Sequence, residues 1–371
     1  MHQDILDSGF IPKEICEKLP PNFNDLEKLA SELPKVLANE QIVERVGQLE
    51  QEKDISKLNL SELERAMLLY SYIGHAYMWG KEHVENIIPA ELSKTWFAIS
   101  EKLERPPILS YASYALNNWK MLDETKPFDL ENIVIMQNFL GGVDEDWFIM
   151  IHVAIEYEAK EILSNLKSYF LEEKLDQSYL QKSLDSIKKI NSIMNRMPEK
   201  CDPFIYYNRV RPYIFGWKNN PATPDGVIYE GVEEYDGKPQ LFRGETGAQS
   251  SIVPALDALL GVTHSNDPLR EYLDEMRLYM PKEHRELLNS LDEWSENTRK
   301  KLDIDEASAS IVNNLIMEVH AFRNKHLEYA RVYIFEQSLT NNSNSNIVGT
   351  GGTPFMKYLD KHLQETVPKN D

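Results

Sequence analysis

The sequence predicts an all-α protein, and three observations support this prediction. Apolar residues recur at three- and four-residue spacing along most of the chain, which is the period of an amphipathic helix. Ser61 and Glu64 form a capping-box pattern directly ahead of an apolar run. No series of alternating strand patterns competes with the helices. The remaining helices are expected near residues 24–39, 85–103, 107–120, 129–140, 147–171, 177–197, 203–217, 253–260, 268–279, 282–300 and 306–337.

Two segments interrupt the helical pattern. Residues 218–251 are rich in glycine and proline, and a connection of this length in a compact domain is either disordered or functional; a short hairpin from Val227 to Phe242 would fit it. Residues 338–354 are polar and of low complexity, so we expect them to be mobile. At its end, Thr353 and Pro354 can begin a last helix as N-cap and first-turn proline, or the glycines can hinge a lid.

The composition excludes several kinds of partner. The 371 residues include 40 Lys and Arg against 60 Asp and Glu, a formal net charge of −20, so we expect no nucleic acid and no membrane partner. Cys16 and Cys201 lie far apart and give no disulfide framework or zinc spacing. The first residues carry acids where a signal peptide needs basic ones, and no later run is long and apolar enough to span a bilayer. We therefore expect a cytoplasmic protein.

One histidine lies in the apolar stripe of the helix expected at 306–337. His326 is either a core histidine whose ring nitrogens have partners, or a metal or haem ligand. His320 lies about 240° away around the helix and cannot share a metal with it. Because no other metal-ligand spacing is present, a single axial histidine on haem is the simplest ligand hypothesis, since the porphyrin supplies four nitrogens. Arg323, within one turn, could pair with a haem propionate or lie on a solvated face.

Two further segments carry candidate residues. His152 lies in the apolar stripe of the helix at 147–171 and is either a satisfied core histidine or a pocket residue that hydrogen-bonds a substrate or oxygen. Tyrosines surround Arg209 and Arg211, an arrangement that suits an aromatic carboxylate ligand but is also typical of core packing. The other histidines, including His264 and His362, lie in polar contexts and are expected to be surface or structural residues.

Taken together, these segments resemble the indoleamine 2,3-dioxygenase family, haem enzymes that open the indole ring of tryptophan. The resemblance covers nearly the whole chain and rests on motifs in the same order: GFIPKEICEKLPPNFNDLEKLASELPKVL, HAYMWGK, RPPILSYASYALNNWK, RPYIFGWKNNP, DGVIYEGV, GAQSSIVPALDALLG, MRLYMPKEHRELL, AFRNKHLEYARVYI and GTGGTPFMKYL. It implies a small N-terminal helical domain at 1–139 and a large haem-binding catalytic domain at 140–371 with a mobile loop at 338–353.

The resemblance also implies the reaction and its partners. The chain would use one haem b to insert both atoms of O2 across the indole C2–C3 bond of L-tryptophan, giving N-formylkynurenine in the kynurenine pathway of tryptophan catabolism. A reductant would be needed to activate ferric haem. The residues that match the family's haem and substrate positions are His326 as proximal ligand, Arg323 at a propionate with Asp257 orienting it, Arg211 at the substrate carboxylate, Phe148, Tyr111 and Gly247 around the pocket above the haem, Thr246 at the border of haem and substrate, and Thr350 on the mobile GTG loop.

The sequence departs from the family pattern at two places. His152 stands where the mammalian enzymes have a serine, and Tyr206 and Tyr207 replace a pair of phenylalanines. A distal histidine is a feature of the related tryptophan 2,3-dioxygenases, where it meets the indole N–H. We therefore expect His152 to orient substrate or oxygen rather than to act as an obligate base. The alternatives are a related haem enzyme acting on another indole or on tryptophan in secondary metabolism, or a non-catalytic haem or oxygen sensor.

Overall fold

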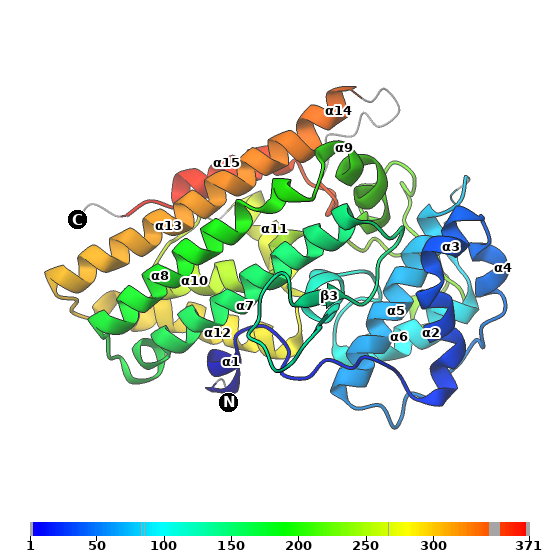
Figure 1. Cartoon of the computed structure of the whole chain (residues 1–371), viewed down its shortest axis with the longest axis horizontal. Coiled ribbons are helices and arrows are strands. Elements are labelled where there is room, and N and C mark those ends of the chain that lie inside the picture. Colours follow the sequence, from blue (N-terminus) through cyan, green and yellow to red (C-terminus); the bar gives the residue numbers. More distant parts are fainter. Residues whose placement is uncertain (1–2, 83, 85, 266, 341–348, 369–371) are drawn as a thin grey trace.

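Helices account for most of the structure, which confirms the all-α prediction (Figure 1). The computed structural model describes residues 3–82, 84, 86–265, 267–340 and 349–368. Over these residues, strands form only two small sheets of two strands each. No helix in the described ranges is long and apolar enough to cross a membrane.

One group of helices forms a bundle. In Figure 1, α8 lies between α7 and α13 and contacts both, and α15 lies along α13. Apart from the five-residue α14, each of these helices packs apolar side chains onto one continuous core. The bundle helices are α7 (Val143–Glu172), α8 (Gln177–Met194), α10 (Ile252–Leu260), α11 (Pro268–Arg277), α12 (Lys282–Asn297), α13 (Glu306–Ala330), α14 (Glu336–Thr340) and α15 (Phe355–Glu365).

A second group of helices gathers at the other end of the molecule (Figure 1). They are α2 (Asn24–Ser31), α3 (Leu33–Ala38), α4 (Ile42–Val46), α5 (Leu60–Trp79) and α6 (Ala90–Leu103). The first helix, α1 (Gln3–Ser8), instead packs against α7 and α12 in the bundle. The domain boundary expected between residues 139 and 140 stays a prediction.

The predicted capping box at Ser61 and Glu64 is wrong by two residues. Asn59 caps α5: its side chain accepts a hydrogen bond from the Glu62 backbone N–H, and the Glu62 carboxylate accepts one from the Asn59 N–H, both at 2.9 Å. Ser61 only donates to the Asn59 side chain. Asn59 also fits the rules for a helix start, so the sequence offered two competing caps.

The helix predicted at 129–140 is also wrong. Strand β3 (Ile133–Ile135) pairs antiparallel with β2 (Trp119–Met121), and Ile133 and Ile135 are buried while Val134 is only half-buried. This is the two-residue period of a strand, which is too short here to stand out in the sequence. The helix expected at 107–120 is reduced to a π-helical segment, η2 (Ala112–Leu116).

Several other boundaries differ from those expected. The helix at 24–39 is broken into α2 and α3 at Glu32, two residues before Pro34. The helix at 85–103 begins only at Ala90, because β1 (Ile87–Ile88) pairs parallel with β4 (Ile228–Tyr229). The segment 203–217 splits into three short elements: α9 (Pro203–Ile205), the π-helical η4 (Tyr206–Val210) and the 3-10 turn η5 (Arg211–Ile214). The helix expected at 306–337 continues after α13 as the π-helical η9 (Arg331–Phe335) and then as α14. Further 3-10 turns are η1 (Pro21–Phe23), η3 (Met197–Glu199), η6 (Glu233–Tyr235), η7 (Gly247–Gln249) and η8 (Arg299–Lys301).

The two interrupting segments are largely irregular. Val227 and Gln240 form an antiparallel bridge, so the expected hairpin is reduced to one residue pair. Thr353 does not cap the last helix: Pro354 is the N-cap, without a side-chain cap, and Thr353 is buried. Of the loop predicted as mobile, residues 341–348 lie outside the described part of the chain.

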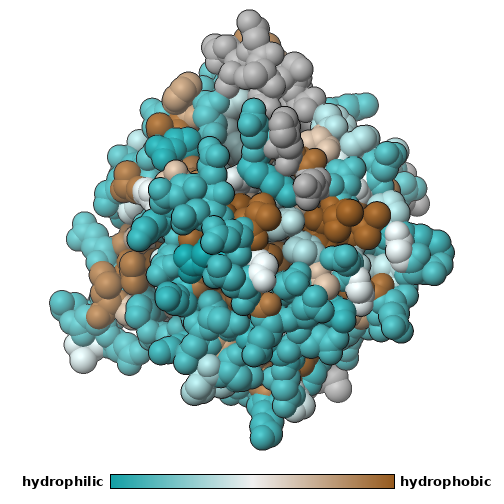
Figure 2. Space-filling view, turned by 90° about the vertical axis from the view of Figure 1, so that its right-hand side faces the viewer, coloured by the Kyte–Doolittle hydropathy of each residue, from teal (hydrophilic) through white to brown (hydrophobic). Residues whose placement is uncertain are grey.

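The face formed by this second group of helices is mostly hydrophilic, with a brown apolar group near its centre (Figure 2). The site that concerns function lies elsewhere, within the bundle.

Candidate functional site

A cavity of about 570 Å³ opens within the helical bundle. Residues of α7, α10, α11, α13 and α15 line it, together with the segments 246–250 and 349–353. This volume is in the range of pockets that hold cofactors and small ligands. Segments that are distant in sequence therefore meet around one space.

Most of the site residues predicted from the sequence lie on this cavity. Those that line it are Tyr111, His152, Thr246, Gly247, Asp257, Arg323, His326 and Thr350. Phe148, Tyr206 and Arg211 do not line it. The first two connect to it through ring contacts: the ring of Phe148 lies 4.5 Å from that of His152 and 4.6 Å from that of Tyr206.

His326 projects from α13 into the cavity and is partly accessible there. Within the described ranges, no protein group hydrogen-bonds its ring, so it is not a core histidine with satisfied nitrogens. Burial, with His152 and Arg323 nearby, lowers the pKa of His326 to about 4. The ring is therefore neutral near pH 7, which is the form that ligates a metal.

His152 projects into the same cavity from α7. Its Nδ1 lies 2.7 Å from the backbone carbonyl oxygen of Phe148, one helical turn earlier. Burial lowers the pKa of His152 and outweighs this hydrogen bond, so the ring is neutral. A carbonyl oxygen can only accept, so Nδ1 carries the proton and Nε2 carries a lone pair. His152 thus offers an acceptor, not a charge.

Aromatic rings surround His152. The Tyr111 ring approaches the His152 ring edge-on, with 6.0 Å between centroids, and the Phe148 ring lies 4.5 Å from it in a tilted arrangement. Tyr111 is the N-cap residue of η2, and its backbone N–H donates a hydrogen bond to the Gln249 side-chain oxygen at 2.9 Å. π-helical segments are frequent at functional sites, and here one begins directly after Tyr111 and another holds Tyr206.

Arg211 lies next to this aromatic group rather than on the cavity wall. It is 4% exposed, and its guanidinium carbon is 4.7 Å from the centroid of the Phe215 ring and 5.3 Å from that of Tyr207. Burial raises the pKa of Tyr206, and the positive charge of Arg211 opposes this rise. The cation therefore packs against aromatic rings and does not line the cavity.

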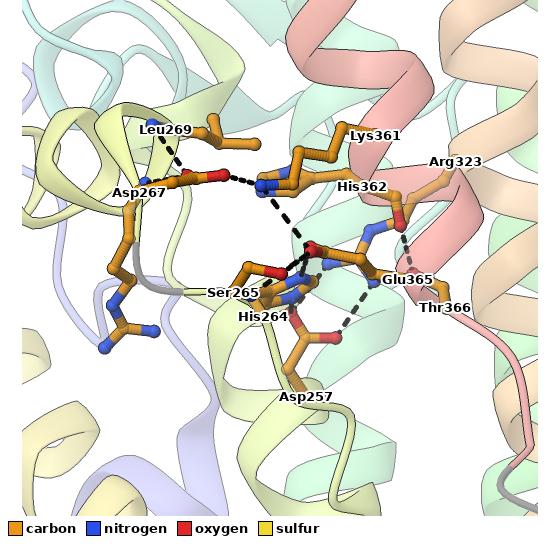
Figure 3. Close-up of polar contacts among 11 residues, drawn as sticks. Asp257, His264, Ser265, Asp267, Leu269, Arg323, Lys361, His362, Glu365 and Thr366 are labelled. Atoms are coloured by element: carbon orange, nitrogen blue, oxygen red, sulfur yellow. Dashed lines mark hydrogen bonds and ion pairs between the residues drawn. The ribbon is translucent and has the colours of Figure 1, made fainter.

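Arg323 and Asp257 form a buried, bidentate ion pair at one edge of the cavity (Figure 3). The Arg323 Nη1 to Asp257 Oδ1 distance is 3.1 Å and the Nη2 to Oδ2 distance is 2.6 Å. Burial alone would raise the pKa of Asp257, but Arg323 and a hydrogen bond from His264 lower it far below its usual value. Asp257 is thus ionised and holds the guanidinium in one orientation.

Two short segments close the cavity from the other side. The Thr350 hydroxyl donates to the backbone carbonyl of Glu245 at 2.5 Å, next to Thr246 and Gly247. Arg243 donates to the Gly351 carbonyl at 2.5 Å, and the Asn219 amide donates to that of Gly352 at 2.9 Å. The GTGG segment is therefore fastened through its backbone beside Thr246.

The sequence analysis missed three cavity residues, Glu156, His264 and His362. Glu156 follows His152 by four residues on α7, accepts from the Tyr111 hydroxyl at 3.0 Å and from Ser250 at 2.5 Å, and burial raises its pKa to about 7. Its place one turn after His152 was readable from helical spacing. His362 also had a signal, since Phe355, Tyr358, Leu359 and His362 form one stripe of α15. His264 lies in a loop and had none.

The residues around the cavity fit a haem. A neutral imidazole without a protein partner supplies an axial ligand, and the cavity is large enough for a cofactor. The fixed Arg323 cation at the edge of the cavity suits a carboxylate such as a propionate. These three features are those expected of a haem-binding cavity, and His152 lines the same cavity.

Comparisons with known proteins agree with this class. The model of the family described as indoleamine 2,3-dioxygenase matches residues 3–369. The chain is 33% identical to indoleamine 2,3-dioxygenase 1 of Rattus norvegicus, over 98% of this chain and 93% of the relative. It is 29% identical to indoleamine 2,3-dioxygenase of Saccharomyces cerevisiae (93% and 87%) and 28% identical to indoleamine 2,3-dioxygenase nanC of Aspergillus nanangensis (97% and 94%).

The chain therefore belongs to the indoleamine 2,3-dioxygenase family. Members of this family depend on haem, and membership makes the chain an oxidoreductase of the dioxygenase type.

Proposed function

We propose that this chain uses one haem b to insert both atoms of O2 across the indole C2–C3 bond of L-tryptophan, giving N-formylkynurenine. The observation that carries the proposal is the pair of neutral histidines on one cavity: His326, which has no hydrogen-bond partner among the described residues, and His152, whose Nε2 is an acceptor. The haem, when bound, supplies the iron at which O2 is activated. All other tasks fall to the side chains of this chain.

Cofactor binding is assigned to three residues. His326 holds the iron, and Arg323 pairs with a propionate while Asp257 keeps the guanidinium oriented. The ionised Asp257 also balances the charge of Arg323 before the cofactor arrives. Thr246, at the N-cap of η7, borders both cofactor and substrate.

Substrate binding is assigned to the aromatic group beside His152. The indole packs against Phe148 and Tyr111, with Gly247 leaving room at the cavity wall and Tyr206 behind Phe148. The substrate carboxylate pairs with Arg211, which does not line the cavity, so the zwitterion must reach beyond the cavity wall. Thr350 and the GTGG segment cover the amino acid and exclude water.

His152 is assigned to orientation. Its Nε2 lone pair accepts a hydrogen bond from the indole N–H, which fixes the C2–C3 bond relative to the iron. Because burial lowers its pKa, His152 is a weaker base than an exposed histidine, and we therefore assign it to orientation rather than to obligatory proton removal. Both oxygen atoms end in the product, so a reductant serves only to activate ferric enzyme.

The experiment mixes anaerobically reduced, haem-loaded protein with O2 and L-tryptophan and determines the mass of the product. A product heavier than tryptophan by two oxygen atoms supports the proposal, and it must be absent from His326→Ala. Haem binding without that product, and turnover of another indole, would support an enzyme of secondary metabolism instead. Haem binding without turnover of any indole would favour a sensor.

A further inference from the structure

His362 is a cavity residue that neither the fold nor the proposed reaction has used. It lies on α15, on the same helical face as Phe355, Tyr358 and Leu359, and all of these line the cavity. Its Nε2 is buried and, within the described ranges, has no hydrogen-bond partner. A buried ring nitrogen without a partner is unusual in a native protein and calls for an explanation such as a bound group.

The neighbouring His264 has the opposite character. Its Nδ1 lies 2.8 Å from a Glu365 carboxylate oxygen and its Nε2 lies 3.0 Å from an Asp257 oxygen (Figure 3). Carboxylates at both nitrogens favour a proton on each, and although burial opposes the charge, these hydrogen bonds raise the pKa of His264. His264 is thus an imidazolium whose two donors are fully used.

The ring of His362 lies beside this cation, tilted by 43° relative to the His264 ring. The two ring centroids are 4.7 Å apart. Burial, together with the nearby charges of Arg323 and His264, lowers the pKa of His362 to about 3, against a smaller opposing effect of Asp257 and Glu365. The His362 ring is therefore neutral and carries one N–H, which can donate a hydrogen bond to an acceptor in the cavity.

Arg323 reaches the same corner with donors to spare. A guanidinium has five N–H groups, and Asp257 and the Thr366 hydroxyl take three of them. Lys361, a further cation of this network, is directed to Asp267 and Glu365 (Figure 3). Arg323 and His362 thus both line the cavity and retain donors for a ligand there.

We propose that His362 is a further haem-binding residue, whose ring N–H donates a hydrogen bond to the propionate that Arg323 pairs with. The assignment rests on the proposed function, because it needs haem in the cavity. A carboxylate offers several acceptor positions, so it can take a bidentate arginine and an imidazole donor together. In this arrangement α15 closes the propionate edge of the site, and His264 fixes Glu365 of α15 against Asp257 of α10.

The test measures haem dissociation, by transfer to excess apomyoglobin, and needs no turnover. His362→Leu removes the donor at similar volume, while His362→Gln retains a donor. Gln364→Leu, an exposed residue of the same helix, is the matched control. A second cofactor, haem with both propionates methyl-esterified, removes the charged acceptor from the other side, and circular dichroism checks that each variant is folded.

We expect His362→Leu to lose natural haem about tenfold faster than the wild type, because a hydrogen bond to a charged group is removed. His362→Gln and Gln364→Leu should stay within about twofold. With the esterified haem, the difference between wild type and His362→Leu should disappear.

Equal rates for wild type and His362→Leu with natural haem would overturn the assignment. So would a difference of the same size with the esterified haem, because the effect would then come from packing of α15. Failure of the wild-type chain to bind any haem would refute the proposed function itself, which separates the two failures.

Discussion

Replacing His152 with alanine is expected to change the selectivity of the enzyme among indoles, while turnover of L-tryptophan is retained. The neutral His152 ring donates Nδ1–H to Phe148 and offers Nε2 to the cavity. L-tryptophan can donate its indole N–H to Nε2, whereas 1-methyl-L-tryptophan has no such hydrogen. With the methylated substrate the buried acceptor loses its partner.

The magnitude follows from the cost of an unsatisfied buried acceptor, about 1–3 kcal/mol. At 1.4 kcal/mol for each factor of ten, the wild type should prefer L-tryptophan over the methylated substrate by about 5- to 150-fold in kcat/KM. Without the imidazole there is no acceptor to leave unpaired, so His152→Ala should bring this ratio close to one, apart from the steric effect of the methyl group.

The assay is steady-state kcat/KM for both substrates, with wild type, His152→Ala and His152→Asn. The asparagine variant is the matched control, because its amide oxygen retains an acceptor. An unchanged ratio in His152→Ala would refute the hydrogen bond. Loss of all turnover in that variant, despite normal haem and tryptophan binding, would instead show that His152 is an obligate base.

Three further predictions concern stability and site geometry. Folding raises the pKa of His264 above 6.5, so protonated His264 stabilises the folded state below that pH, and this stabilisation is lost as the pH rises through the folded pKa. Chemical unfolding should therefore show His264→Gln less stable than the wild type by about 2 kcal/mol at pH 6, and by less at pH 9. The Glu64→Ala variant leaves the buried Arg105 guanidinium without its carboxylate partner, so the free energy of unfolding of this variant should be lower than that of the wild type by about 3–5 kcal/mol. An unchanged free energy of unfolding would contradict a structural role for this pair. Gly244→Ala would place a Cβ against the backbone of Gly216, so thermal unfolding should show a loss of about 1–3 kcal/mol together with weaker haem binding, and normal behaviour would show that the two segments are not in close approach.

The long helices of the site could be predicted from the sequence. α13 and α7 are 25 and 30 residues long, so their apolar stripes repeat many times and place His326 and His152 on the inner face. The family resemblance then connected these two histidines with Arg323 and Asp257, and the structure brings all four to one cavity.

The sequence failed where the signal was short or depended on tertiary contacts. The three-residue strand Ile133–Ile135 has too few residues for its period to be recognised, and Asn59 and Ser61 were equally good caps. His264 became a cavity residue only because the loop after α10 meets α15, where the Glu365 carboxylate accepts a hydrogen bond from its ring. No local pattern reports such an encounter.

The position of Arg211 shows a different limit. Its tyrosine-rich surroundings were readable, yet the guanidinium packs against the rings of Phe215 and Tyr207 and does not line the cavity. Which face of a short π-helical segment meets a cavity depends on the neighbouring helices, and here η4 packs on α7 and η9.

The most direct test of the account is the spectrum of ferrous, haem-loaded protein in wild type and in His326→Gly, with and without added imidazole. The account predicts a histidine-ligated haem spectrum in the wild type, its loss in the variant, and its return when imidazole fills the space left by the side chain. A histidine-ligated spectrum in His326→Gly without imidazole would contradict the account, because another residue would then hold the iron.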